Sequence, residues 1–379
     1  MLQEKFDLAV VGAGIVGLAH ALAAARLGKR VVVIDRDAQA NGASVRNFGF
    51  VTVTGQERGR TWNLARRSRD VWAEIAPQAG IAIEQRGLTM VARRPESHAL
   101  LAAFLRTEMG EGCRLLSTAE ARTHLPGAAQ DAPAGALFSP HDLRVDSPTA
   151  IPRLAAWLEA AFGVTFLRDT AVREVTTGRV TTSRGRIDCE AVVVCPGDDL
   201  STLYPDQIAA HAVQRCRLQM LRLADPGFRL PSAVMSDLGL VRYLGYAVLP
   251  EAAAVRARLE AEQAEHLAHG VHLIVVQGLD GSLVVGDSHH YAQTPDPFAM
   301  EAVDALILDE YARVLGPPPA VLQRWTGTYA SSAVHSFIET PEPSVRLVIV
   351  TSGTGASTSF GLAEEVIGEL YGVQKDFAA

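Results

Sequence analysis

Three glycines at fixed spacing, followed by an acidic residue, are the first residues in this chain whose types point to chemistry. Gly12, Gly14 and Gly17 form a G-x-G-x-x-G pattern, and Asp35 ends the next apolar run. Gly12 permits a tight turn, Gly14 lets backbone approach a pyrophosphate, and Gly17 lets a helix pack on a strand. A carboxylate at this distance can bind a pair of ribose hydroxyls. The pattern therefore predicts a dinucleotide site.

The residues around these glycines read as a strand, a helix and a second strand. Apolar residues 8–11 predict a buried parallel strand, residues 15–27 a helix that ends at Gly28, and residues 30–34 another buried strand. A pyrophosphate would lie at the start of the helix, where unpaired N–H groups and the helix dipole favour negative charge. Asp35 favours FAD or NAD over NADP, whose extra phosphate it would repel. The motif alone does not separate FAD from NAD.

Length, charge and cysteine usage restrict the class of protein. A chain of 379 residues exceeds a usual single core, so we expect two domains. A net charge of −7 disfavours nucleic acid and anionic membranes as partners. No apolar run reaches the roughly 20 residues that a spanning helix needs, and a strand begins close to Met1, so we expect a cytoplasmic protein without a signal peptide. The four cysteines lack C-x-x-C or zinc spacing and are expected to be reduced thiols.

Three later segments have the composition of functional loops. Residues 41–56, NGASVRNFGFVTVTGQ, are irregular and polar where an NAD-type domain would continue with further βαβ units. A buried strand ends in VVVCPG at Pro196 and Gly197, and the last buried strand, 345–350, leads into SGTGASTSFG and a C-terminal helix. Predicted strands also cover 211–223 and 233–249, and a capping box is predicted at Ser117. No linker or repeat separates these parts, so we expect interleaved domains.

Taken in order, these motifs resemble the D-amino-acid-oxidase-like family of FAD-dependent oxidoreductases, which includes glycine oxidase and sarcosine oxidase. The matching pieces are GAGIVG with Asp35, ASVRNFG, VVVCPG, LDGSLVVGD, WTGTY and GTGASTSFG, and they span nearly the whole chain. Within the family, ASVRNFGFV with TGQ, GDSHHY and TSGTGAS are similar to a bacterial clade associated with aminophosphonate breakdown.

The resemblance implies an α/β fold in which a glutathione-reductase-type FAD-binding Rossmann domain is interleaved with a substrate domain rich in antiparallel sheet. The FAD domain is expected to comprise residues 1–80, 140–212 and 320–379, and the substrate domain residues 81–139 and 213–319.

The cofactor that the resemblance implies is noncovalent FAD, since no cysteine lies in the C-terminal segments where a covalent link would be expected. Ser44, Arg46, Asn47 and Gly49 are expected beside the flavin ring, with the start of the last helix under its pyrimidine edge, where the dipole stabilises the reduced flavin. The full expected set is Gly12, Gly14, Ile15, Val16, Gly17, Asp35, Arg36, Ser44, Arg46, Asn47, Phe48, Gly49, Val172, Pro196, Gly197, Gly327, Gly353, Thr354, Gly355, Ala356 and Ser357.

The expected substrate contacts are cationic, aromatic or hydroxyl side chains. An anionic substrate group needs positive charge and hydrogen-bond donors, and arginine is best suited to a bidentate grip. Neighbouring strand residues face opposite ways, so at most one of His289 and His290 faces substrate. Adjacent histidines without a third ligand disfavour a metal site, and none is predicted. The catalytic candidates are Arg46, Tyr246, His289, His290 and Tyr329, and the further candidates are Arg242, Tyr243, Ser331, Ser332 and His335.

The activity implied by the resemblance is oxidation of a small anionic amine to an imine, which then hydrolyses to an aldehyde. An aminoalkylphosphonate is the favoured substrate, with dioxygen or another electron acceptor as partner. A D-amino acid, glycine or sarcosine oxidase is one alternative. An NAD-dependent dehydrogenase that shares only the first βαβ unit is another, and a flavin-carrying scaffold subunit is a third. The sequence leaves the exact amine, the acceptor and the oligomeric state open.

Overall fold

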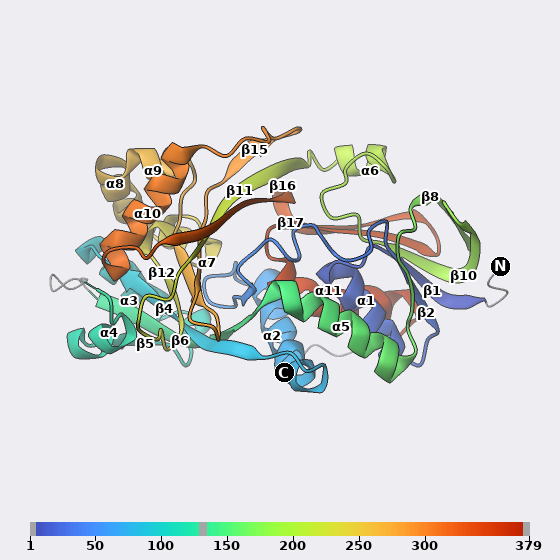
Figure 1. The fold of residues 1–379 in the computed structure, drawn as a ribbon, viewed down its shortest axis with the longest axis horizontal. Coiled ribbons are helices and arrows are strands. Elements are labelled where there is room, and N and C mark those ends of the chain that lie inside the picture. Colours follow the sequence, from blue (N-terminus) through green and yellow to red (C-terminus); the bar gives the residue numbers. More distant parts are fainter. Residues whose placement is uncertain (1–4, 129–134, 374–379) are drawn as a thin grey trace.

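The computed structural model describes residues 5–128 and 135–373, which form an α/β fold (Figure 1). One part is a parallel sheet built from the N-terminal, middle and C-terminal segments of the chain. Its strand order is β17-β10-β1-β2-β7, and each neighbouring pair is parallel. The strands are β1 (Phe6–Val11), β2 (Val31–Ile34), β7 (Thr165–Leu167), β10 (Gly185–Val194) and β17 (Val345–Ser352).

The glycine pattern forms the turn between β1 and helix α1 (Ile15–Arg26). Gly12 has a φ of +103°, a conformation that favours glycine. A Cβ atom at Gly12 would overlap the carbonyl oxygen of Cys195, and one at Gly17 would overlap the carbonyl oxygen of Gly12. The backbones of turn, helix and β10 are therefore in direct contact, which confirms the packing role predicted for Gly17.

Helices and a small sheet cover the parallel strands. Helix α1 packs against α5 (Ser147–Phe162) and α11 (Gly355–Leu370), and α11 also packs against α2 (Arg60–Gln78). The first half of β10 leaves the parallel sheet and forms an antiparallel one with β8 (Val172–Thr176) and β9 (Arg179–Thr182). The short helix α6 (Pro205–Ala209) follows β10 in the chain.

The second part is a larger, mainly antiparallel sheet, drawn on the left in Figure 1. Its order is β11-β14-β13-β12-β4-β6-β5, in which only the β12–β4 pair is parallel among the described strands. These strands are β4 (Ile83–Ala92), β5 (Arg114–Leu116), β6 (Gly135–Val145), β11 (Gln214–Leu223), β12 (Ala233–Met235), β13 (Ile274–Gln277) and β14 (Leu283–Gly286). Strand β3 (Phe50–Val51) pairs with β6, and β15 (His290–Ala292) pairs with β11.

Short helices surround this sheet. They are α3 (Pro95–Phe104), the 3-10 helix η1 (Glu108–Gly110), α4 (Thr118–His124), the 3-10 helix η2 (Asp237–Val241), α7 (Leu244–Ala247), α8 (Ala252–Glu262), α9 (Ala264–Ala268) and α10 (Glu301–Leu315). The predicted capping box is confirmed at α4, where the Ser117 hydroxyl accepts from Glu120 N and the Glu120 carboxylate accepts from Ser117 N.

One strand belongs to both sheets. Strand β16 (Val321–Glu342) pairs with β11 from Val321 to Ser331 and with β17 from Ser331 to Glu342. The register along β17 shifts between Ser331 and Ser336, so residues 332–335 leave the regular ladder. Tyr329 and Ser331 therefore lie at the point where the two sheets meet.

The buried apolar side chains form separate clusters for the two sheets. One cluster contains Leu88, Leu218 and Val275 and belongs to the larger sheet, whereas two others, around Leu18 and Val192, lie on the two faces of the parallel sheet. These separate cores support the proposed two-domain division, whose residue boundaries remain a prediction.

The sheet predicted over residues 233–249 is wrong beyond Met235. The chain turns there into η2 and α7 because Gly245 packs directly on the backbone of Gly55 and donates its N–H to the Gly55 carbonyl. That long-range contact leaves no local sequence signal.

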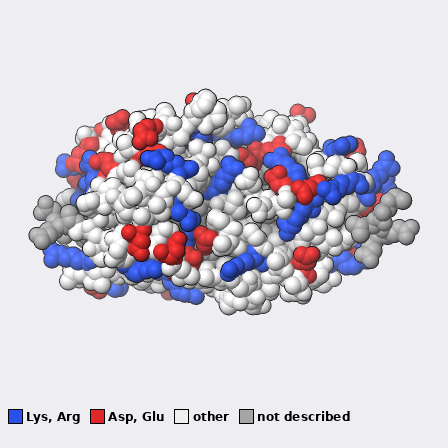
Figure 2. Space-filling model, viewed as in Figure 1, with Lys and Arg blue, Asp and Glu red and all other residues white. Residues whose placement is uncertain are grey.

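The surface carries both signs of charge. Figure 2 shows Lys and Arg interspersed with Asp and Glu over the face in view. Within residues 5–128 and 135–373, no helix has the length and apolar character needed to cross a bilayer.

The contact at Gly17 gives a first prediction. In Gly17→Ala the added methyl group collides with backbone, so we expect the free energy of unfolding to fall by about 1–3 kcal/mol, the usual cost of overpacking. Urea denaturation of the apoprotein measures it. Gly42→Ala is the matched control, because a Cβ atom there meets nothing within 4 Å. Equal stability of Gly17→Ala and wild type would contradict the packing described above.

Candidate active site

A cavity of about 530 Å³ lies where three parts of the chain come together. These are the glycine turn, the start of α11 and the point near Ser331 where β16 passes from one sheet to the other. Its size is typical of a small-molecule or cofactor site. It brings together most of the cofactor candidates, namely Gly12, Gly14, Ile15, Val16, Gly17, Asp35, Arg36, Ser44, Arg46, Asn47, Phe48, Pro196, Gly197, Gly327, Gly353, Thr354, Gly355, Ala356 and Ser357. It also includes the substrate candidates Arg242, Tyr243, His289, Tyr329, Ser331, Ser332 and His335.

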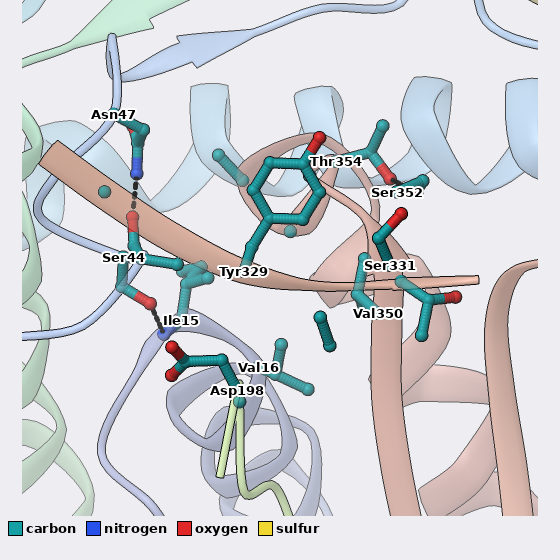
Figure 3. Close-up of a pocket in the computed structure, with 18 of the residues that line it drawn as sticks. Ile15, Val16, Ser44, Asn47, Asp198, Tyr329, Ser331, Val350, Ser352 and Thr354 are labelled. Carbon is teal, nitrogen blue, oxygen red and sulfur yellow. Dashed lines mark hydrogen bonds between the residues drawn. The ribbon is translucent and has the colours of Figure 1, made fainter. Parts of the chain in front are cut away.

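Two side chains accept hydrogen bonds from the backbone of the glycine turn beside this cavity. The Asp35 carboxylate at the end of β2 accepts a hydrogen bond from Ala13 N at 2.6 Å. The Ser44 hydroxyl accepts from Ile15 N, the first residue of α1, at 2.9 Å (Figure 3). Gly14 lies under Ser44, since a Cβ atom on Gly14 would come within 2.9 Å of Ser44 Oγ. The loop that contains Ser44 is thus fixed against the helix start.

The start of α11 is the second helix N-terminus at the cavity. Gly353 precedes it with a φ of +70°. The Trp72 indole N–H of α2 donates to the Ala356 carbonyl at 2.9 Å, and Thr52 N donates to Ser357 Oγ at 2.9 Å. Because helix N-termini favour negative charge, this position suits an electron-rich ring or an anion.

Asp142, which the sequence did not indicate, holds the loop between Phe50 and Gln56. One oxygen of this buried carboxylate accepts from Val53 N at 2.7 Å, Thr54 N at 3.0 Å and Thr52 Oγ1 at 3.1 Å. The other accepts from Thr54 Oγ1 at 2.6 Å. Residues 52–54 of the irregular polar segment predicted to be a functional loop are therefore anchored by one carboxylate from β6.

Tyr329 packs over the turn that begins α11. A Cβ atom on Gly353 would lie 3.1 Å from Tyr329 Cζ, and the Tyr329 side chain is mostly buried. Figure 3 shows its ring between Ser44 and Ser331 in that view. Burial raises the pKa of this phenol well above its usual value, so it stays protonated at neutral pH.

Arg242 and Arg46 are the two candidate anion-binding groups, and their surroundings differ. The Arg242 guanidinium donates to the Tyr291 hydroxyl at 3.0 Å, and no carboxylate lies within salt-bridge distance of it in the described part of the chain. Arg46 donates to Asn41 at 3.1 Å, while its backbone carbonyl accepts from the Trp325 indole. Both line the cavity, Arg46 from the loop that contains Ser44 and Arg242 from the segment between η2 and α7.

His289 lies in a buried group with two residues that sequence reasoning missed, His272 and Asp287. His272 Nδ1 is 3.1 Å from Asp287 Oδ1, and His289 Nε2 is 3.8 Å from Asp287 Oδ2. Burial raises the pKa of the Asp287 carboxyl to about 8, against the opposing effect of the Arg242 guanidinium, and it lowers the pKa of both imidazoles well below their usual value. Asp287 directly follows the apolar strand β14, and this position is the signal that could have identified it.

The group of His272, Asp287 and His289 also has the geometry of a metal site, which the sequence analysis did not predict. Its three ligand atoms lie within 4.8 Å of one another, close enough to share a cation. The argument that His289 and His290 lack a third ligand is therefore wrong, because Asp287 lies two residues before His289 and His272 reaches it from the segment before β13. The expectation of a metal-free protein remains a prediction.

Four of the predicted site residues do not line the cavity. Tyr246 is fully buried and packs on Phe104 at a ring-centroid distance of 4.6 Å. His290 faces away from His289, toward His269, as strand alternation requires. The remaining two have structural roles: Gly49 contacts the Val145 backbone, where no Cβ atom fits, and Val172 is buried in the core of the small sheet.

The residues present fit a dinucleotide cofactor with a fused ring system. The glycine turn brings backbone and a helix N-terminus to one end of the cavity, beside the Asp35 carboxylate. The second helix start, where Gly355 lies beside Ile15 of α1, and the Tyr329 ring border the same cavity. A pyrophosphate suits the first position, and an electron-accepting ring suits the second.

A family model described as "FAD dependent oxidoreductase" matches residues 7–368. The chain belongs to this family. FAD is therefore its cofactor, and the family assignment overrules the NAD-dependent alternative. A glycine oxidase from Geobacillus kaustophilus is 27% identical over 211 residues, which cover 52% of this chain and 55% of that protein. The match thus spans about half the length of this curated relative.

Solved structures share the fold over nearly the whole chain. The glycine oxidase from Geobacillus kaustophilus superposes with a TM-score of 0.78 at 19% identity, covering 99% of this chain and 97% of that one. The L-proline dehydrogenase from P. horikoshii gives a TM-score of 0.79 at 18% identity, covering 100% and 96%. The predicted fold class is thereby confirmed.

The Asp142 contacts give a second prediction. Asp142→Ala leaves several buried donors without partners, so we expect the free energy of unfolding to fall by about 3 kcal/mol and FAD to bind more weakly. Urea denaturation and titration of the apoprotein with FAD measure the two effects. Asp188→Ala is the control, because the exposed Asp188–Arg179 pair contributes about 1 kcal/mol or less. A variant that matches wild type in both measurements would show that Asp142 does not order the loop.

The third prediction concerns the cofactor linkage. The Cys195 thiol lines the cavity but is buried, and burial raises its pKa, so it is a poor nucleophile. We expect acid precipitation to release all the yellow colour into the supernatant as intact FAD. Colour retained on the protein pellet would show a covalent link.

Proposed function

We propose that this protein oxidises a small amine that also carries an anionic group. The observation that supports this most directly is the presence of two opposite charge receptors in one cavity. The Arg242 guanidinium has no salt-bridged acid among the described residues, and the Asp287 carboxyl is buried nearby. Such a pair is complementary to a molecule with an ammonium at one end and an anion at the other.

FAD, when bound, would accept a hydride equivalent from the carbon next to the amine nitrogen. The chain's own residues would bind and orient the substrate. Arg242 and the Tyr291 hydroxyl offer donors to the anion, and the Tyr329 ring, which packs over the turn before α11, lines the same cavity. The product would be an imine, which hydrolyses in water to an aldehyde and a smaller amine or ammonia.

We further propose an aminoalkylphosphonate, such as 2-aminoethylphosphonate or an N-methyl derivative, as the preferred substrate. The GDSHHY and TSGTGAS segments support this assignment by their resemblance to the aminophosphonate clade. The cavity also offers more donors than a carboxylate needs, since Tyr243 and Tyr291 lie beside Arg242. A D-amino acid, glycine or sarcosine oxidase remains the second candidate, favoured by the similarity to a glycine oxidase.

The fourth prediction tests the substrate class and the anion grip together. The FAD-loaded protein is mixed anaerobically with 2-aminoethylphosphonate, its N-methyl derivative, glycine, sarcosine, D-alanine and ethylamine, and bleaching of the flavin absorption is followed. We expect the phosphonates to bleach it fastest and ethylamine to be at least tenfold slower at equal concentration. Faster reduction by glycine or D-alanine would assign the chain to the second candidate. Admitting air afterwards shows whether dioxygen is the electron acceptor.

Two variants distinguish the role of Arg242 from that of Arg46. Arg242→Gln should weaken binding of the preferred anionic amine by about 10- to 100-fold, because it removes charge-assisted hydrogen bonds worth about 1.5–3 kcal/mol. Arg46→Gln should change the rate or the FAD affinity more than the substrate affinity, since Arg46 lies on the loop that holds α1. The reverse pattern would assign the anion grip to Arg46.

A further inference from the structure

The buried group formed by His272, Asp287 and His289 contains polar atoms without hydrogen-bond partners. His272 Nε2 has no partner, and His272 Nδ1 and Asp287 Oδ1, although 3.1 Å apart, do not meet each other in hydrogen-bond geometry. The exposed fractions of the three residues are only 3%, 4% and 7%, yet all three line the cavity. Buried polar groups without partners are costly, so such a cluster is expected to contact a ligand.

The tautomer of His289 determines what that ligand must offer. His289 Nδ1 lies 2.9 Å from the Gly270 carbonyl oxygen. A carbonyl only accepts, so Nδ1 carries the ring proton. Burial and the nearby Arg242 charge lower the pKa of His289, so the ring is neutral and its Nε2 atom is an acceptor. Nε2 therefore faces Asp287 Oδ2, another acceptor, at 3.8 Å.

In the ionised form of Asp287, Oδ2 and His289 Nε2 are both acceptors and need a shared donor, whereas the neutral acid would supply its own O–H. An ammonium group has several N–H donors and a positive charge, and it can satisfy Asp287 and His289 together. Two imidazoles and one carboxylate are also a common ligand set for a divalent metal ion, but the positive Arg242 guanidinium acts on the same carboxylate and repels a dication more strongly than an ammonium. An ammonium carries half the charge of such an ion and brings its own hydrogens.

We propose that Asp287, assisted by His289, binds the ammonium group of the substrate and takes a proton from it before oxidation. The inference rests on the proposed function and adds the group that makes the amine reactive. In this step one N–H bond of R–CH₂–NH₃⁺ breaks and an O–H bond forms on the Asp287 carboxylate, giving R–CH₂–NH₂ and a neutral carboxylic acid. Nothing is oxidised or reduced in the transfer.

The chemical advantage follows from the protonation of free amines. An alkylamine with a pKa near that of lysine, about 10.4, is neutral in only about one molecule in a thousand at pH 7.4. An acceptor whose pKa lies close to the working pH is the most effective general base. The buried Asp287 carboxyl, with its pKa raised to about 8, meets that condition.

The groups around Asp287 set the sign of the pH dependence. His272 and His289 face it as neutral rings, and Arg242 faces it as a fixed positive charge. Tyr243 remains a protonated phenol and Cys216 a protonated thiol, because burial raises the pKa of both groups. Only Asp287 changes charge near neutrality within this set. It must be ionised to accept a proton, so flavin reduction at low substrate concentration should rise with pH through about 8.

The fifth prediction compares wild type with Asp287→Asn, using anaerobic flavin reduction by 2-aminoethylphosphonate and glycine from pH 6 to 10.5. We expect the second-order rate constant of the variant to be about 10²-fold lower at pH 7.5, in the usual range for a general base. In a plot of this rate constant against pH, the rise should shift in the variant to a higher pH, toward the pKa of the free amine. Asp188→Asn, on the exposed surface, should behave like wild type. An unchanged pH profile in Asp287→Asn overturns the proposal.

A binding measurement separates this role from a structural one. Ethylphosphonate and acetate lack the amine, and their effect on the flavin spectrum reports their affinity. Asp287→Asn should bind them within about twofold of wild type, and 2-aminoethylphosphonate or glycine at least tenfold more weakly. Equal weakening of all four ligands would mean that the substitution merely disturbs the cavity. Metal analysis of purified wild type completes the test, since a stoichiometric metal ion would also overturn the proposal.

Two controls keep the result interpretable. If Asp287→Asn fails to retain FAD, His289→Gln is tested in the same way, with an expected loss of about tenfold and the same preference for amine-bearing ligands. If wild type is reduced by none of the amines, the proposed function fails. The ammonium site is then still tested by whether Asp287→Asn loses affinity for amine-bearing ligands alone.

Discussion

Direct backbone contact at the glycine turn is the constraint on which the rest of the site depends. Gly17 must lie against Gly12, and Gly12 against Cys195, before α1 can start at the carboxyl end of the central strand β1. Only then does Ile15 N reach the Ser44 hydroxyl and bring the polar loop over the helix start. Helix α11 packs on α1, so the position of the second helix N-terminus follows from the first.

Two carboxylates near the site show how similar groups acquire different roles through their partners. Asp142 accepts hydrogen bonds from Val53, Thr54 and Thr52, and it acts as a fixed anchor for the loop. Asp287 is equally buried but faces imidazole nitrogens, one of which is an acceptor. A satisfied buried carboxylate stabilises a fold, whereas a poorly satisfied one has a raised pKa and is suited to binding or proton transfer.

The sequence predicted those parts of the fold that are determined by residues close together in the chain. The strand, glycine turn and helix at residues 6–26, the capping box at Ser117 and the Gly-rich start of α11 were all visible locally. The group of His272, Asp287 and His289 was not, because His272, which precedes β13, meets the segment of Asp287 and His289 only through long-range backbone pairing. Tyr246 was misassigned for a related reason, since burial against Phe104 depends on a helix far away in sequence.

The shared strand β16 has a mechanical consequence. Because its hydrogen-bond ladder continues from β11 to β17, a rigid-body hinge between the two sheets would have to break backbone pairs on one side. The interruption at residues 332–335 is the compliant point, and it lies at the cavity, where His335 contacts Glu57. Because β16 is paired on both sides of this point, a change in the angle between the two sheets would disrupt backbone hydrogen bonds next to the cavity.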